Sequence, residues 1–178
     1  MRVLIILSLF ICLSAGAQDT AASHRSPDYS YFKSNLLLGG FASLEHTGAE
    51  LGLTTAFGFK AVTAGALLQV QRHEIFQMQM ALLFGFRVKC KKLKCYFSAG
   101  PGKHKETDQY TIYYAPQNKW LGYGTRYAYY RGLFLHTEVV KSKDSNGLGF
   151  GGYTTVFIGD GMYSIGVGIN FMLGTRQY

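Results

Sequence analysis

The chain has 178 residues, a formal net charge of +8 and 22 glycines. Charged residues make up only 16% of it, against about 25% in an average soluble domain, and aromatic residues make up 15%. The length allows one domain, and the shortage of charge indicates that much of the surface does not face water.

The N-terminus has the pattern of a secretory signal peptide. Met1 and Arg2 form a basic start, residues 3–13 are an apolar run too short to span a membrane, and residues 15–17 read Ala-Gly-Ala. We therefore predict a signal peptide over residues 1–17, a polar, flexible N-terminal arm over 18–33, and a β-barrel domain over 34–178. Export makes nucleic acid an improbable partner despite the positive charge.

From residue 34 onward the apolar residues recur with a period of two, which is typical of β-strands with two different faces. Residues 50–59 and 61–71 follow this pattern. It is clearest over residues 76–88, where seven alternate positions are apolar and the positions between them are mostly glutamine, alanine or glycine.

The alternation continues to the C-terminus over residues 121–129, 132–140 and 163–173. It is weaker over 148–158, 36–45 and a short stretch after Lys92, and residues 109–114 would be a tenth strand. Arg131-Gly132, residues 143–147 and Asp160-Gly161 are turn signals. A barrel whose termini lie on one side needs an even number of strands. We expect ten strands, with eight as the alternative.

The two faces of the strands indicate which side meets water. Each strand has the length that a tilted strand needs to cross a bilayer, and its large apolar row is almost free of charge. The opposite row is small and polar, which would be a poor surface for a soluble protein. We therefore predict an all-β, antiparallel up-and-down transmembrane barrel. The expected lipid-facing residues are Phe76, Met78, Met80, Leu82, Phe84, Phe86, Ile165, Val167, Ile169 and Phe171. The alternative is a soluble exported ligand-binding barrel with this apolar face inward.

The inner rows carry few charges, and we expect these to pair, because an unpaired buried charge is costly. The predicted lumenal polar network consists of Glu50, Arg87, Arg126, His136 and Glu138. Small inner side chains suit a narrow barrel whose lumen is filled by side chains rather than open as a pore.

Residues 34–173 resemble the small outer-membrane β-barrel proteins of Gram-negative envelopes. Ser164, Gly166, Ile169 and Phe171 in the last strand are similar to the assembly signal of that family. The resemblance implies a place in the cell outer membrane, with outer-membrane lipid and the outer-membrane assembly machinery as partners. It also implies a structural or surface-interaction role, and it names no external partner.

Two further motifs have a chemical and a structural interpretation. His136 and Glu138 share one face and would suit a lipid-modifying enzyme, but a lumenal ion pair is the commoner role. Cys90 and Cys95 are predicted to form a disulfide in an oxidising compartment, with two thiols as the alternative. Their spacing fits neither redox nor zinc motifs, so no metal and no cofactor are expected.

Basic and aromatic residues gather near the ends of the strands. The lysines at 89–94, with Arg87 and residues 103–105, predict a basic collar. It could bind lipid phosphate groups or anionic sugars, but a solvated rim is the commoner role. Tyrosines crowd residues 110–130, as expected for an aromatic girdle at a membrane–water interface or for a projecting binding loop.

Overall fold

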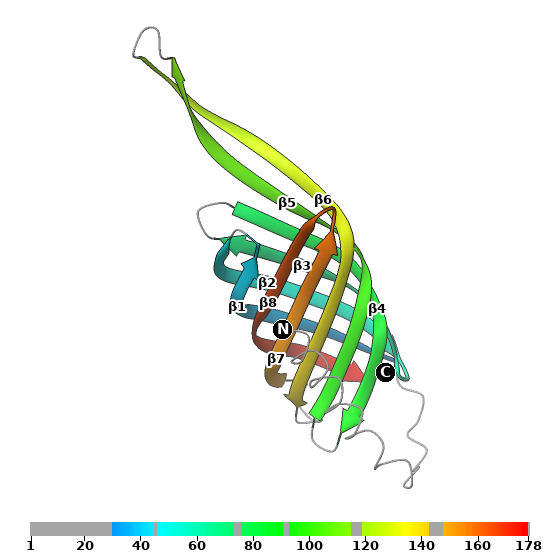
Figure 1. Ribbon diagram of the computed structural model, residues 1–178. Coiled ribbons are helices and arrows are strands. Elements are labelled where there is room, and N and C mark those ends of the chain that lie inside the picture. The colour runs from blue at the N-terminus through cyan, green and yellow to red at the C-terminus, as the bar shows by residue number, and fades with distance from the viewer. Residues whose placement is uncertain are drawn as a thin grey trace.

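The computed structural model describes residues 30–44, 46–72, 76–90, 93–114, 119–142 and 148–177. These residues form eight antiparallel strands. Each strand pairs with its neighbour in the chain, and β8 pairs with β1, so that the sheet closes into a barrel (Figure 1). The strands are β1 (Ser30–Ser43), β2 (Thr47–Phe59), β3 (Val62–Arg72), β4 (Phe76–Cys90), β5 (Leu93–Tyr114), β6 (Lys119–Ser142), β7 (Leu148–Gly159) and β8 (Met162–Gln177).

The expectation of ten strands is wrong, and the alternative of eight is confirmed. Residues 109–114 are the end of β5, and the segments 121–129 and 132–140 are one strand, β6. Arg131-Gly132 is no turn, because both residues stay in the ladder opposite Lys103 and Gly102. Glycine at position 132 lets the backbones of β6 and β7 approach closely, since a Cβ on Gly132 would lie 2.3 Å from the carbonyl oxygen of Ile158.

Strands β5 and β6 extend beyond the barrel. The pairing of β4 with β5 reaches Thr107, and the pairing of β6 with β7 begins at Leu133. The remaining parts of β5 and β6 pair only with each other, so they form a two-stranded hairpin that projects from one end of the barrel (Figure 1). This projecting hairpin is the largest departure from a plain barrel.

The barrel begins earlier in the chain than the sequence predicts. The signal peptide over 1–17 and most of the arm lie outside the described residues. Residues 30–33, expected in the arm, belong to β1 and pair with β2.

At the other end of the barrel, Asp160-Gly161 forms the predicted turn between β7 and β8. Both residues have positive φ, 42° and 78°, as a tight hairpin turn requires.

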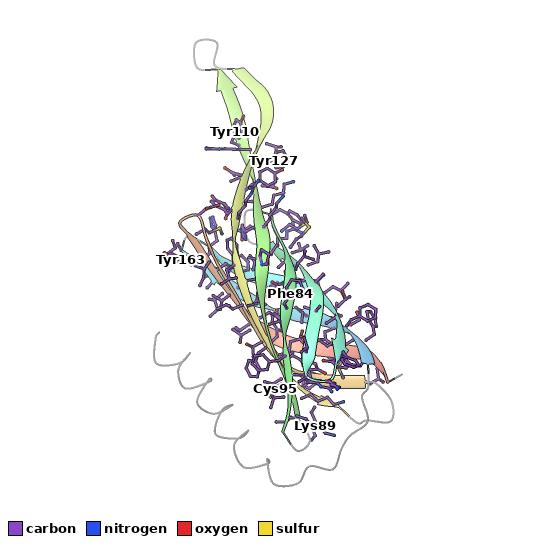
Figure 2. All side chains as sticks on the ribbon, turned by 90° about the vertical axis from the view of Figure 1, so that its right-hand side faces the viewer. Phe84, Lys89, Cys95, Tyr110, Tyr127 and Tyr163 are labelled. Carbon is purple, nitrogen blue, oxygen red and sulfur yellow. The ribbon has the colours of Figure 1, made fainter. Side chains whose placement is uncertain are left out.

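The rows of side chains point as the membrane-barrel hypothesis predicts. On β4, Phe84 is 61% exposed on the outer wall, whereas its neighbour Leu83 is 5% exposed inside. Figure 2 shows Phe84 midway along the wall, with Tyr110 and Tyr127 on the projecting hairpin and Cys95 near the opposite end. Among the described residues, no helix is long and apolar enough to cross a membrane.

Candidate functional site in the lumen and on the outer wall

The carboxylate of Glu138 is the centre of the best-connected cluster in the lumen. Four side chains from three strands converge on it. Lys33 and Asn35 lie on β1, Thr54 lies on β2 and His136 lies on β6. The Lys33 ammonium forms a buried ion pair with Oε2 of Glu138. Asn35 Nδ2 donates to the same oxygen at 2.5 Å, and Thr54 Oγ1 and His136 Nε2 lie 2.8 Å from Oε1. The carboxylate is thus fully supplied with donors, as a buried charge requires.

A second carboxylate, Glu50 on β2, is held by neutral donors. Gln69 Nε2 lies 2.9 Å and Tyr153 Oη 2.6 Å from Oε1, and Gln71 Nε2 lies 2.6 Å from Oε2. Gly166 on β8 makes room for this carboxylate, since a Cβ there would lie 2.4 Å from Glu50 Oε1. The glycine at position 166, on the inner face of β8, is therefore explained by the carboxylate that it faces.

Gln69 connects the two carboxylates. Its amide nitrogen also donates to Thr155 Oγ1 at 3.2 Å, and Thr155 Oγ1 lies 2.8 Å from His136 Nδ1. His136 then contacts Glu138 through its other ring nitrogen. One continuous hydrogen-bonded chain therefore runs from Glu50 to Glu138 across the lumen, and it joins strands that are distant in sequence.

The network continues toward the hairpin end of the barrel. Gln79 Nε2 donates to His104 Nδ1 at 2.9 Å. Because an amide nitrogen only donates, the proton of a neutral His104 ring is on Nε2, which lies 3.4 Å from Oε1 of Glu106. Glu106 also accepts from Gln77 at 3.0 Å and from the Tyr130 hydroxyl at 3.3 Å. The polar chain thus extends to the base of the projecting hairpin.

The predicted network residues fall into two groups. Glu50, His136 and Glu138 lie together in the lumen, as described above. Arg87 lies at the end away from the hairpin, where it stacks 4.3 Å from the Tyr31 ring and donates to the Lys60 carbonyl oxygen at 3.1 Å. Arg126 is not in the lumen. It is exposed on the projecting hairpin opposite Asp108, because β6 joins the barrel only from Leu133 onward, after this position.

Several lumenal residues escaped the sequence interpretation. Lys33, the cation beside Glu138, was assigned to the arm because the polar residues before it hide the start of β1. The buried glutamines Gln69, Gln71, Gln77 and Gln79 were read only as polar positions. Their alternate spacing on β3 and β4 could have indicated a lumenal network, because four amides on the inner faces of paired strands need hydrogen-bond partners.

The geometry of Thr155, His136 and Glu138 resembles a hydroxyl–imidazole–carboxylate relay. All three side chains are buried, and the cavity beside the His136–Glu138 pair has a volume of about 20 Å³. That is room for about one water molecule, which is too little for an acyl chain in this cavity. The three side chains are packed among their neighbours in the lumen. Among the described residues, no group of three or more His, Cys, Asp or Glu side chains is arranged to hold a metal ion.

The outer wall is a continuous apolar surface. Eight of the residues expected to face lipid are exposed there, and Met78 and Ile165 are half-buried on the same face. The exposed ones are Phe76, Met80, Leu82, Phe84, Phe86, Val167, Ile169 and Phe171. This arrangement is the reverse of what the soluble alternative requires, in which these side chains fill the interior.

Basic and aromatic side chains border this wall where the hairpin leaves the barrel. Lys105 Nζ lies 4.3 Å from the centre of the Tyr127 ring and 5.8 Å from that of Tyr129. Lys103 and Arg131 lie opposite each other on the same outer face, next to the Lys105–Tyr129 pair. The part of the predicted collar at residues 103–105 therefore coincides with the girdle on β5 and β6. The expectation of one collar is wrong, because Lys89 and Lys94 lie beside the β4–β5 turn at the opposite end of the barrel.

Cys90 and Cys95 lie on adjacent strands. Cys95 pairs with Val88, and Cys90 pairs with Leu93, so the two cysteines occupy the same face one diagonal step apart. Cys95 is buried, and the side chain of Cys90 lies outside the described part of the structure. The disulfide remains a prediction.

Comparison with solved structures supports the fold. No protein-family model and no curated protein sequence matches the chain. The N-terminal β-barrel domain of Pseudomonas aeruginosa OprF superposes with a TM-score of 0.52 at 12% identity, covering 80% of this chain and 97% of that one. Neisserial surface protein A superposes with a TM-score of 0.56 at 9% identity, covering 81% and 96%. At such identities the likeness concerns the fold, an eight-stranded closed antiparallel barrel.

Proposed function

We propose that this protein is a small outer-membrane β-barrel with a structural or surface-interaction role and a lumen filled by its own side chains. The observation that carries the proposal is the inverted distribution of polarity. Large apolar side chains such as Phe84 cover the outer wall, and two carboxyl groups, Glu50 and Glu138, lie inside with the glutamine amides. A water-soluble protein of this size does not expose so continuous an apolar surface.

The lumen favours a structural role over transport. A hydrogen-bonded network centred on Glu50 and Glu138 crosses it, and aromatic residues fill much of the remaining space. Phe134 and Phe157, for example, are completely buried with ring centroids 4.8 Å apart. Such packing is typical of eight-stranded barrels, whose interior is just wide enough to be filled.

The projecting hairpin supports a role in surface interaction. It carries Tyr110, Tyr127 and Tyr129, which are 49%, 53% and 64% exposed, on strands that continue from the barrel without a break. It lies at the end opposite the two terminal strand ends, Ser30 and Gln177. We propose that this end faces outward, that outer-membrane lipid surrounds the wall, and that the assembly machinery inserts the barrel through its last strand.

Envelope fractionation followed by a heat-modifiability gel tests this proposal. The protein should remain in the outer-membrane fraction until detergent is added, and its band should shift on boiling because the folded barrel resists denaturation at room temperature. A protein recovered in the soluble fraction without detergent contradicts the proposal. A truncated chain lacking β8 provides the control for the shift, since it cannot close the barrel.

A further inference from the structure

A groove crosses the outer wall from β2 to β5 and has a volume of about 520 Å³. Thr55 on β2 and Ala66 on β3 pair with each other toward its β2 end, and both side chains are short. The neighbouring positions carry much larger apolar side chains, so the wall is hollowed where the short ones stand. The large side chains beside them are Leu53, Leu68, Met80 and Leu82.

One end of this groove is cationic. Lys103 lines it from β5, is exposed, and lies opposite Met80 on β4 and Arg131 on β6. Among the described residues no carboxylate forms an ion pair with Lys103. Lys105, one step further along the same row, is directed over the tyrosine rings of the hairpin. Lys103 is therefore the cation that serves the groove.

We propose that this groove binds one acyl chain of a bilayer lipid whose headgroup has a net negative charge, an anionic phosphate with no cationic group beside it, and that Lys103 contacts this phosphate. The inference rests on the proposed membrane location and goes beyond it, since it selects one lipid chemistry at one place on the wall. An apolar trough matches an acyl chain, and a cation at its end matches the charge of the headgroup. Arg131, opposite Lys103, adds positive charge where the phosphate would lie.

Small side chains at the groove also favour a tightly packed chain. Within a bilayer, apolar surfaces associate mainly through van der Waals packing rather than by exclusion of water. A hollow lined by Ala66 between Leu68 and Leu82 offers more contacts to a chain than a flat wall does. A zwitterionic lipid would occupy the hollow but would gain less from Lys103.

Native mass spectrometry of the full-length protein in detergent micelles tests the proposal, with dimyristoyl phosphatidylglycerol and dimyristoyl phosphatidylcholine as the probes. Wild type should retain one phosphatidylglycerol molecule more tightly than phosphatidylcholine. Lys103→Gln should weaken phosphatidylglycerol binding by about fivefold and leave phosphatidylcholine unchanged. Ala66→Phe, which fills the groove, should weaken both lipids.

Two control variants test whether the loss of lipid binding is specific to Lys103 and to the groove. Lys141→Gln removes an exposed outer lysine at the far end of β6, and Ala49→Phe adds an aromatic ring to the wall away from the groove. Both should bind phosphatidylglycerol as wild type does. Each variant is first shown to be heat-modifiable, so that loss of lipid binding is distinguished from loss of the barrel.

Three results would overturn the proposal. Equal losses in Lys103→Gln and Lys141→Gln would show a diffuse charge effect. Equal retention of glycerol phosphate, which has no acyl chain, would show a site for free phosphate. Dimers that disappear in Ala66→Phe, without lipid adducts in wild type, would make the groove an interface between two copies. A wild-type protein that is soluble without detergent would instead contradict the membrane location itself.

Discussion

Lys33 on β1 and Glu138 on β6 form an ion pair inside the barrel, although they are 105 residues apart in the chain. Both side chains are almost fully buried. The pair ties the first strand to the sixth across the lumen, not along the sheet. The filled lumen therefore holds together opposite walls that the backbone ladder connects only through neighbouring strands.

Removing one member of this pair should be costly. Lys33→Met leaves the Glu138 carboxylate buried without its cation, which should lower the free energy of unfolding by about 3–5 kcal/mol. Urea unfolding of the barrel reconstituted in lipid vesicles, followed by circular dichroism, measures the loss. The double variant Lys33→Met/Glu138→Gln removes both charges and should lose less than the sum of the two single variants. Strictly additive losses would show that the pair is not coupled.

Gly166 should tolerate no side chain. Gly166→Ala would place a Cβ 2.4 Å from Glu50 Oε1, whose carboxylate is fixed by three donors, so unfolding free energy should fall by about 1–3 kcal/mol. Gly152→Ala is the matched control, because a Cβ there meets its nearest atom at an ordinary 3.5 Å. The same urea titration compares them. If both variants unfold alike, Gly166 is not there to make room for Glu50.

The lumen should not conduct ions in the manner of a porin. Phe134, Phe157 and Gln69 are fully buried within it, and the cavity beside Glu138 has room for about one water molecule. Planar-bilayer recordings of the purified protein should show no stable conductance steps. Reproducible steps that scale with salt concentration would contradict a filled lumen.

The cysteine prediction is tested by peptide mapping under non-reducing conditions. Cys90 and Cys95 share one face of adjacent strands but lie one diagonal step, about 7 Å, apart, so a disulfide requires a shift at the β4–β5 turn. If the turn shifts in this way, oxidation should link the peptides that contain them. Reduction should separate these peptides. Alkylation of both cysteines in protein purified without reductant would instead establish two thiols.

Period-two alternation was sufficient to predict the all-β barrel and which face points outward. The signal is strong because each strand has one face against side chains and one on the outer wall, as Leu83 and Phe84 illustrate. The number of strands was missed because alternation does not show where a strand continues. Gly132 resembles a turn residue in sequence, but in the barrel it permits close backbone approach within β6.

The site was predictable only in part, for a related reason. Glu50, His136 and Glu138 have inward parity inside the barrel and were found. Arg126 has the same parity as Glu138, but it lies on the part of β6 that extends beyond the barrel. The alternation of apolar and polar residues predicts which face of the sheet a side chain is on. It does not predict whether that part of the strand lies within the barrel or beyond its end. The partner of Glu138 was missed because the polar residues before Lys33 hide the start of β1, so that Lys33 fell within the predicted arm.

Fluorescence quenching at the wall tests the central claim most directly. In a Trp120→Phe background, a single tryptophan replaces Phe84 in the middle of the wall, and in a second protein it replaces Tyr127 on the projecting hairpin (Figure 2). After reconstitution in vesicles, lipids brominated on their acyl chains should quench the tryptophan at position 84 and spare the one at position 127. Aqueous iodide should do the opposite. If iodide quenches both tryptophans equally and brominated lipid quenches neither, the apolar wall does not face a bilayer.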